Sequence, residues 1–285
     1  MIIDCHTHLA KLPEDYSKEL LEDYDRAWAH KGGGDMNKGP QDHLRAMGVV
    51  EKAIVFGLKA KDSGFWTTND YIADYVKSDP EKLIGFASVD PNHEDALMEI
   101  KRSVKTLGLK GLKMGPIYQH FDPTDKKYYP IWELAQELGL PIIIHQGTTF
   151  VRNAPLKYAF PILLEDIALS FPDLIVVVAH MGHPWEEETI ALIRKQPNFY
   201  SDVSALIPRP YRFYNDLVLA MEYGVLDKLI FGSDYPIFTP AQTMEGLQSI
   251  NSFVKGTNLP KIPEEAINNI ISRNAERALK KVLVN

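Results

Sequence analysis

The sequence predicts an α/β protein of the (β/α)8 TIM-barrel class. Eight short runs rich in Ile, Val, Leu and Phe recur along the 285 residues, and segments with helical spacing separate them. Runs such as Ile142–Ile144 are continuously apolar, so these strands need covering on both faces, as in parallel sheets enclosed by helices. Eight such units close most simply into a barrel. The predicted strands are Ile2–His8, Ala53–Leu58, Leu83–Val89, Gly111–Met114, Pro141–His145, Leu174–His180, Phe199–Val203 and Leu229–Ser233.

Amphipathic segments between these runs predict the crossover helices. Gly139 and Gly224 stand where a helix C-terminus favours a left-handed residue. Pro80, Pro172 and Pro197 end helices because the residue before a proline avoids the helical region. The predicted helices are Gln41–Met47, Asn69–Ser78, Asp95–Leu107, Pro130–Leu138, Pro161–Ser170, Trp185–Arg194, Arg212–Tyr223 and Thr243–Val254.

The two ends of the chain complete the predicted barrel. Leu9–Pro40 is the longest irregular stretch, and a loop of that length is typically functional or disordered. The segment from Pro263 to Leu283 predicts one or two closing helices packed on the outside. No linker-like segment or repeat interrupts the chain, so we expect one domain over residues 1–285.

Composition and charge limit the classes of partner. Lys and Arg total 31 against 38 Asp and Glu, and the formal net charge is -7, so nucleic acid is an unexpected partner. The single cysteine, Cys5, excludes an intrachain disulfide and favours a reducing cytoplasm. No apolar run has the length of a signal peptide or a membrane span. We therefore expect a cytoplasmic enzyme acting on a small molecule, and a homo-oligomer is left open.

Titratable residues gather at the C-terminal ends of the predicted strands, where barrel enzymes place their chemistry. His6 and His8 end the first strand, His145 the fifth and His180 the sixth, and Asp234 follows the eighth. A core does not usually collect several titratable groups on one rim. This concentration therefore predicts a metal centre.

Strand alternation predicts how the first strand presents its side chains. His6 and His8 share one parity and can grip one ion, whereas Cys5 and Thr7 are expected to point outward to the helices. Mixed nitrogen and oxygen ligands favour zinc, with manganese, cobalt or iron as competitors.

The motifs that carry these residues resemble those of the amidohydrolase superfamily. They are Asp4-Cys-His-Thr-His, the strands ending in His145 and His180, and Gly232-Ser-Asp-Tyr-Pro. The amidohydrolase-related branch, which includes aminocarboxymuconate semialdehyde decarboxylase, is the most similar. The resemblance implies one metal ion bound by His6, His8, His145 and Asp234, with His180 orienting or deprotonating a water molecule.

Lys113, at the end of the fourth strand, is the one departure from a simple one-metal site. Two-metal members of the superfamily carry a carboxylated lysine on that strand, so the resemblance leaves open a binuclear centre with His145 and His180 as ligands of a second ion. An unmodified Lys113 that contacts a substrate oxygen, or a solvated lysine at the rim, is the favoured interpretation.

The ligand set alone leaves the reaction open. The first hypothesis is a hydrolase in which Asp234 and His180 are catalytic and a metal-activated water attacks an amide, ester or lactone of a carboxylated substrate. The alternative is a non-oxidative decarboxylase of a small aromatic or muconate-like acid. A metal-dependent deoxyribonuclease is disfavoured because the fourth strand lacks the expected glutamate, and an inactive barrel that only binds a ligand is the alternative from another class. Candidate substrate contacts are Trp28, Tyr118, His120, Arg152, Arg209 and Tyr211.

Overall fold

Eight parallel strands form one sheet in the computed structural model, which describes residues 1–28 and 35–283. Each strand pairs with the next along the chain, and the register is parallel throughout. Backbone bonds from Cys5 N to Phe231 O at 3.0 Å and from His8 N to Tyr235 O at 2.8 Å join the first strand to the segment of the last. The predicted barrel and all eight predicted strands are confirmed. The strands are β1 Ile3–His8, β2 Lys52–Phe56, β5 Leu83–Ser88, β6 Leu112–Met114, β7 Ile142–Ile144, β8 Val176–Val178, β9 Phe199–Asp202 and β10 Leu229–Ile230.

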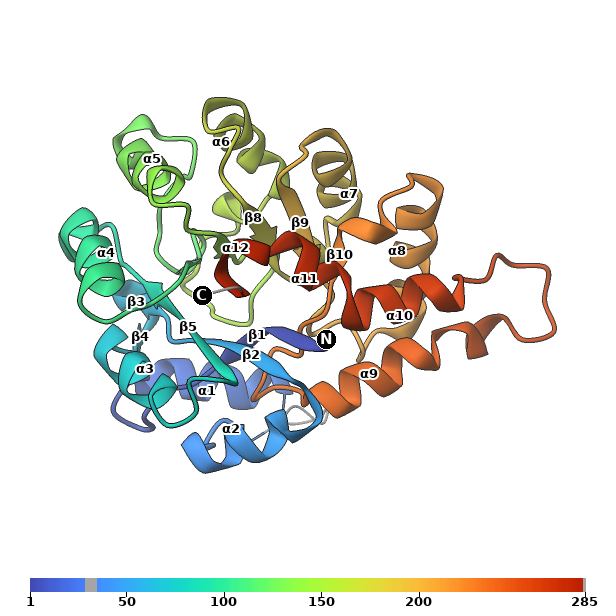
Figure 1. The fold of residues 1–285 in the computed structure, drawn as a ribbon, viewed down its shortest axis with the longest axis horizontal. Coiled ribbons are helices and arrows are strands. Elements are labelled where there is room, and N and C mark those ends of the chain that lie inside the picture. The colour runs from blue at the N-terminus through green and yellow to red at the C-terminus, as the bar shows by residue number, and fades with distance from the viewer. Residues whose placement is uncertain (29–34, 284–285) are drawn as a thin grey trace.

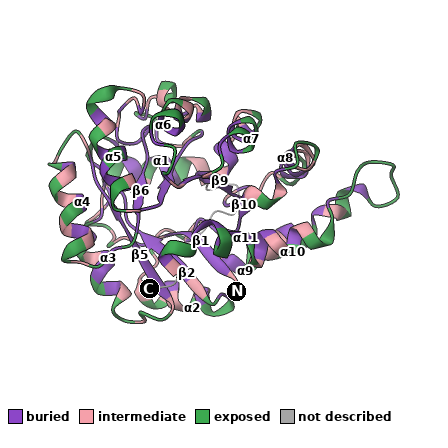
Figure 2. Ribbon diagram, turned by 45° about the horizontal axis from the view of Figure 1, so that its top comes forward, coloured by how far each residue is buried: buried purple, intermediate pink, exposed green. Residues whose placement is uncertain are grey.

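Helices surround this sheet, so that strands are buried and helices expose one face (Figures 1 and 2). Their caps follow the sequence: the side chain of Thr68 accepts a hydrogen bond from Tyr71 N, and that of Asp95 accepts one from Met98 N. The outer helices are α2 Pro40–Ala46, α3 Asn69–Val76, α4 Ala96–Lys105, α5 Tyr129–Glu137, α6 Glu165–Ser170, α7 Glu186–Lys195, α8 Pro210–Glu222 and α9 Pro240–Gln248. None of the described helices is long and apolar enough to cross a membrane.

Two elements differ from the loops that the sequence predicts. The stretch between β1 and α2 contains a helix, α1 Lys18–Trp28, and residues 29–34 of this stretch lie outside the described residues. After β2, a short antiparallel hairpin forms from β3 Lys59–Ala60 and β4 Phe65–Trp66. Both insertions follow strand ends, and both supply residues to the cavity described below.

The helices α11 and α12 lie across one end of the barrel rather than on its outer surface, which corrects part of the sequence-based expectation, whereas α10 packs on the outside beside α9 as expected (Figure 1). Asn274 in α11 donates through Nδ2 to the carbonyl of Leu229, at the start of β10, at 2.8 Å. Apolar residues of α11 and α12 join a core cluster of strand residues that includes Ile3 and Ile230. The helices are α10 Glu264–Ser272, α11 Asn274–Ala278 and α12 Lys280–Leu283. Of these, α11 and α12 close the N-terminal end of the barrel and leave the C-terminal end for the site.

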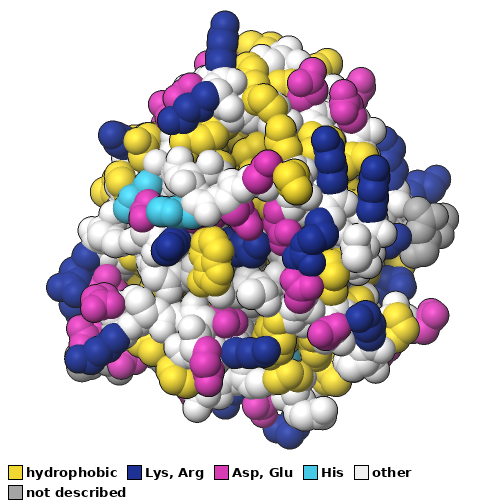
Figure 3. Space-filling model, turned by 90° about the vertical axis from the view of Figure 1, so that its left-hand side faces the viewer, with side chains coloured by type: hydrophobic (Ala, Val, Ile, Leu, Met, Phe, Trp, Pro, Cys, Tyr) yellow, Lys and Arg dark blue, Asp and Glu magenta, His cyan; other side chains and the backbone are white. Residues whose placement is uncertain are grey.

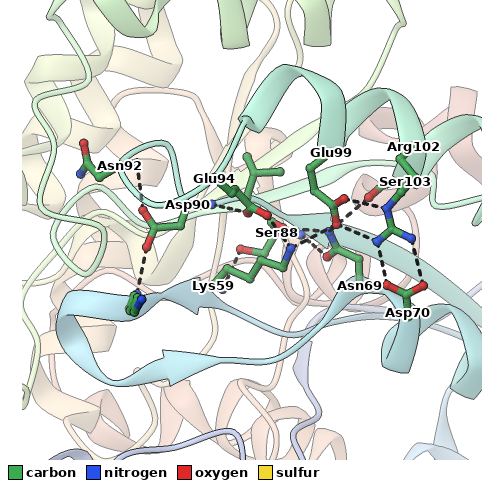
Figure 4. Close-up of polar contacts among 12 residues, drawn as sticks. Lys59, Asn69, Asp70, Ser88, Asp90, Asn92, Glu94, Glu99, Arg102 and Ser103 are labelled. Atoms are coloured by element: carbon green, nitrogen blue, oxygen red, sulfur yellow. Dashed lines mark hydrogen bonds and ion pairs between the residues drawn. The ribbon is translucent and has the colours of Figure 1, made fainter.

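A charged network fixes the hairpin to the helices beside it (Figure 4). Lys59 Nζ lies 2.8 Å from Glu94 Oε2 and 3.1 Å from Glu99 Oε1, and all three side chains are largely buried. Arg102 donates to Glu99 at 2.7 Å and to Asp70 in α3 at 2.7 Å. The network thus links the hairpin, α3 and α4. On the face drawn in Figure 3, acidic and basic side chains are interspersed over the surface.

Candidate active site

Three side chains from opposite ends of the sequence meet at the C-terminal mouth of the barrel. His6 Nε2 lies 3.2 Å from His8 Nε2, and each of these nitrogens is 3.4 Å from Asp234 Oδ1. Asp234 reaches them because its backbone N donates to His6 O at 2.8 Å and its φ is +64°, a left-handed conformation that aspartate tolerates. Two imidazole nitrogens and a carboxylate oxygen thus converge on one point.

Asp202, at the end of β9, orients the first of these ligands. Its Oδ2 lies 2.8 Å from His6 Nδ1, and both side chains are fully buried. The carboxylate accepts a hydrogen bond from Nδ1–H, which leaves the lone pair on Nε2, the nitrogen that lies near Asp234. A carboxylate behind a histidine is the usual support of a metal ligand.

His180 approaches the same point from the end of β8. One ligand atom each from His6, His180 and Asp234 lie within 4.8 Å of one another. The His180 Nδ1 atom is 2.7 Å from Ser204 Oγ, and the backbone N of His180 donates to Asp202 Oδ1 at 3.0 Å. His180 and Met181 both have positive φ, 55° and 50°, and consecutive non-glycine residues in this region mark strained backbone of the kind found at functional sites.

His145 lies beside this group without joining it as closely. Its ring centroid is 5.1 Å from that of His180 and 4.6 Å from that of Tyr118. Its Nε2 contacts the carbonyl of Thr148 at 3.3 Å. His145 is therefore a neighbour of the group formed by His6, His180 and Asp234. Its Nε2 faces the carbonyl of Thr148 in this conformation.

The charge states of these groups suit a divalent cation. Burial lowers the pKa of His6 and of His8, lowers that of His145 well below its usual range, and lowers that of His180 to about 4. Burial alone would raise the pKa of Asp234, but the neighbouring His180 and a hydrogen bond from His8 hold it below its usual value. Neutral imidazoles and an ionised carboxylate are the deprotonated forms that bind metals, so the donor set fits such an ion.

Lys113 lies at the floor of the site with its amine toward the histidines. Its Nζ is 3.0 Å from His6 Nε2 and 4.6 Å from the centre of the Phe56 ring. The side chain is buried, and this burial lowers its pKa to about 8. Lys113 is thus a buried residue of the site and not a solvated lysine at the rim.

The strand alternation expected for β1 is correct for Thr7 and wrong for Cys5. Thr7 Oγ1 lies 2.9 Å from His43 Nε2 in α2, on the outside of the barrel. Cys5 belongs instead to the core cluster of Ile3 and of the helices below the barrel. The pairing of β1 with β2 shifts register between Asp4 and Thr7, and such a bulge changes which side chains face inward.

A cavity of about 510 Å³ opens above this cluster. Its floor contains His8, Lys113, His145, His180 and Asp234. Its walls are aromatic and cationic, with residues from α1, the hairpin and the loops after β6, β7, β8 and β9. The aromatic and cationic residues of the wall are Tyr16, Arg26, Trp28, Phe65, Tyr118, Phe150, His183 and Arg209.

Half of the expected substrate contacts line this cavity: Trp28, Tyr118 and Arg209 do, whereas His120, Arg152 and Tyr211 do not. His120 lies 3.2 Å from Ser63 Oγ beneath the hairpin. Arg152 forms an ion pair with Asp23, and Tyr211 is 71% exposed on the surface. A loop position in the sequence does not say which way a side chain turns, and this explains the difference.

Asp202 and Ser204 are functional candidates that sequence reasoning missed. Asp202 stands near the end of a predicted apolar strand, which is the same signal that pointed to His145. The signal was available, but aspartates are also common as caps and in turns.

Comparison with known proteins places this geometry in a family. The amidohydrolase family model matches residues 3–281. The chain belongs to this family. The match covers nearly the whole barrel, so the metal-ligand motifs and the closing helices fall within it.

Individual relatives of this amidohydrolase-family chain are distant. The 2-amino-3-carboxymuconate-6-semialdehyde decarboxylase of Dictyostelium discoideum is 24% identical over 221 residues, which are 66% of this chain and 61% of that protein. The chain thus matches less than two thirds of this relative's length. Three curated relatives are enzymes, two decarboxylases and a hydratase.

Solved structures share the fold. An uncharacterized TIM-barrel protein from Bordetella bronchiseptica has a TM-score of 0.77 at 21% identity, with 99% of both chains covered. A dihydroxybenzoic acid decarboxylase from Polaromonas sp. JS666, solved with manganese and the inhibitor 2-nitroresorcinol, has a TM-score of 0.61 at 17% identity, with 100% of this chain and 99% of that chain covered.

Proposed function

We propose that this protein is a metal-dependent carboxy-lyase that removes carbon dioxide from a small, planar carboxylic acid. The convergence of His6, His8 and Asp234 at the floor of an aromatic and cationic cavity carries the proposal. The names of the relatives favour the decarboxylase alternative over hydrolysis, which receives no specific support from them.

The cavity walls suit an aromatic or conjugated acid. Its volume of about 510 Å³ is in the range of pockets for small ligands. Tyr118, Phe65 and Trp28 offer apolar ring faces, and the indole Nε1 of Trp28 is buried without a hydrogen-bond partner among the described residues. A planar substrate can stack on these rings while its polar groups reach the cations.

Arg209 is the proposed anchor for a carboxylate of the substrate. It is partly buried in the cavity wall, and among the described residues its guanidinium donates a hydrogen bond only to Ala205 O, at 3.4 Å. Burial lowers the pKa of Arg209, which means that the guanidinium is desolvated. An anion would therefore find an unneutralised cation with a bidentate donor geometry.

The proposed ligands of the ion are His6, His8, His145 and Asp234, with Asp202 supporting His6. When bound, a divalent ion would supply electrostatic stabilisation for negative charge on the substrate oxygens. The mixture of nitrogen and oxygen ligands favours zinc, whereas the dihydroxybenzoic acid decarboxylase from Polaromonas sp. JS666 was solved with manganese. Both ions are therefore used in the assay described below.

The remaining chemistry is assigned to the protein's own groups. The carbon–carbon bond to the carboxylate breaks, its electron pair stays on the substrate carbon, and carbon dioxide leaves. Asp234, ionised at rest, takes up a proton from water that enters the cavity and passes it to this carbon, which returns Asp234 to the carboxylate form, and His180 hydrogen-bonds a substrate oxygen. Lys113, unmodified, contacts the same oxygen and offsets its charge.

The test is a direct assay of carbon dioxide release. Protein loaded with zinc or manganese is incubated with 2,6-dihydroxybenzoate and with 2-amino-3-carboxymuconate semialdehyde, and Asp234→Asn serves as the control. We expect release from at least one acid and its loss in the variant. Hydrolysis of 4-nitrophenyl acetate by the metal-loaded wild type alone, without release of carbon dioxide from either acid, would support the hydrolase alternative and overturn the proposal.

A further inference from the structure

His183 is a cavity residue to which the sequence assigns no role. It follows β8 in the motif His180-Met-Gly-His-Pro-Trp, and it lines the same cavity as Lys113, His180 and Arg209. Its side chain keeps 17% of its surface exposed. It is neither a core histidine nor a freely solvated one.

A buried carboxylate holds one of its ring nitrogens. His183 Nδ1 lies 2.5 Å from Glu186 Oε1, and Glu186 is fully buried at the start of α7. Arg212 of α8 donates to the other oxygen, Oε2, at 2.5 Å, and its Nε lies 3.0 Å from Asp216. Burial alone would raise the pKa of Glu186, but the hydrogen bonds from His183 and Arg212 hold it below its usual value.

The ionised Glu186 therefore fixes the tautomer of His183. A carboxylate without a proton only accepts hydrogen bonds, so Nδ1 of His183 is the donor. In the neutral ring Nε2 is then free to accept a hydrogen bond. No described protein group is hydrogen-bonded to that nitrogen.

The main chain of His183 is fixed as firmly as its ring. Thr148 N donates to His183 O at 2.7 Å. Gly147 has a φ of +126°, and a Cβ there would lie 2.5 Å from His183 O, so the backbone approach requires glycine. The loop that follows His145 thus holds the loop that carries His183.

We propose that His183 is a substrate-contacting residue, whose Nε2 accepts a hydrogen bond from a hydroxyl substituent of the bound acid, and that Glu186 is its positioning residue. The inference rests on the proposed function for the kind of acid that enters the cavity. A role confined to structure would need only the contact between His183 and Glu186. Contact with a ligand would also explain why Nε2 has no protein partner among the described residues and why the backbone of His183 is held rigidly beside the cavity.

Two variants separate the structural contact from the contact with the ligand. His183→Asn keeps an amide near the position of Nδ1, where it can still donate to Glu186, but it removes the cavity-facing nitrogen. His183→Gln places its amide near the position of Nε2. His93→Asn is the control, because His93 lies away from the cavity in an exposed pair with Asp62.

The experiment measures binding of 2-nitroresorcinol to manganese-loaded protein by titration calorimetry. We expect His183→Asn to raise Kd about tenfold, equivalent to about 1.4 kcal/mol, with partial recovery in His183→Gln. Metal content and Tm should stay at wild-type values, and His93→Asn should bind as the wild type does. Wild-type affinity in His183→Asn would overturn the proposal.

A second readout does not depend on the probe. Nitrogen-15 spectra of histidine-labelled protein should show His183 protonated at Nδ1 and bare at Nε2, and Glu186→Gln should abolish this preference. A ring protonated at Nε2 instead would contradict the inference even if 2-nitroresorcinol does not bind. Failure of the wild type to bind this probe or to release carbon dioxide, with the tautomer as expected, would count against the proposed function and not against the positioning of His183.

Discussion

At the scale of single residues, Asp202 decides how well His6 can serve as a ligand. The 2.8 Å contact to Nδ1 fixes the tautomer and the ring orientation of a fully buried imidazole. Asp202→Asn keeps the shape but replaces the acceptor by an amide. We expect metal affinity to fall about 10- to 100-fold, measured by competition with a chromophoric chelator. Unchanged affinity would remove Asp202 from the site.

The two histidines that follow β7 and β8 are expected to differ in their effects. His145→Ala should lose bound metal and activity together, because His145 is a proposed ligand. His180→Ala should largely keep one metal ion per chain and lose turnover. Both variants are compared with the wild type by their metal content, measured by mass spectrometry, and by their rate of carbon dioxide release. Loss of metal from His180→Ala would make His180 a ligand, consistent with its place within 4.8 Å of His6 and Asp234.

Sequence reasoning reached most of this site because its residues stand at strand ends. The parity of His6 and His8 follows from strand geometry, but Cys5 shows the limit of that rule. A bulge is set by hydrogen bonding between neighbouring strands, which the pattern of one strand does not contain. The direction of Arg152 likewise depends on Asp23 in α1, a helix that the sequence pattern did not predict.

At the scale of elements, the network of Figure 4 stabilises the hairpin against α3 and α4. Burial would raise the pKa of Glu99, yet hydrogen bonds from Arg102, Asn69 and Lys59 lower it to about 2. We expect Glu99→Gln to reduce the free energy of unfolding by about 2 kcal/mol, because it removes the charged acceptor that Lys59 and Arg102 share and leaves them only Glu94 and Asp70. Thermal unfolding measures this, with the exposed Asp74→Asn, which pairs with Lys77, as a control that should change stability little.

The pH dependence of this effect has a definite sign. A carboxyl group whose folded pKa is depressed stabilises the fold above its unfolded value, 4.5, and this stability is lost as the pH falls toward about 2. The difference in stability between wild type and Glu99→Gln should therefore be constant near neutrality and shrink below pH 4.5. A difference that grows on acidification would contradict the assigned role of Glu99.

The elements that sequence reasoning missed are α1, whose amphipathic pattern lies within the stretch Leu9–Pro40 that we expected to be a loop, and the hairpin of β3 and β4. The helix α1 is rich in charged residues, and its signal was a capping serine, Ser17, whose Oγ accepts from Leu20 N at 3.2 Å. The hairpin strands have two residues each, too few for an alternating pattern. The helices α11 and α12 were predicted, but their position was not. They pack on the apolar end of the closed barrel, a surface that exists only after all eight strands have assembled.

At the scale of the whole molecule, the eight strands and the outer helices were predictable because each repeats the same burial pattern. Closure of the sheet brings His6 and Asp234, which are 228 positions apart, into contact. A bound ion would therefore link the first and last strands of the barrel. Ligands that bind only the folded state raise its stability by mass action.

Metal removal should consequently lower the stability of the entire chain. With free metal about a thousandfold above Kd, the bound ion adds about 4 kcal/mol. Dialysis against a chelator should lower Tm by several degrees, and readdition of zinc or manganese should restore it. Scanning calorimetry measures the shift, and the His145→Ala variant should show a much smaller one. An identical Tm with and without metal would mean that no ion bridges these strands.

The most direct test is a crystal structure of manganese-loaded protein with anomalous data collected at the manganese edge. The account predicts one strong peak within coordination distance of His6 Nε2, His8 Nε2 and Asp234 Oδ1, with the His145 ring turned toward it from the carbonyl of Thr148. The absence of a peak between these three atoms in fully loaded protein, or a peak elsewhere in the cavity, would contradict it.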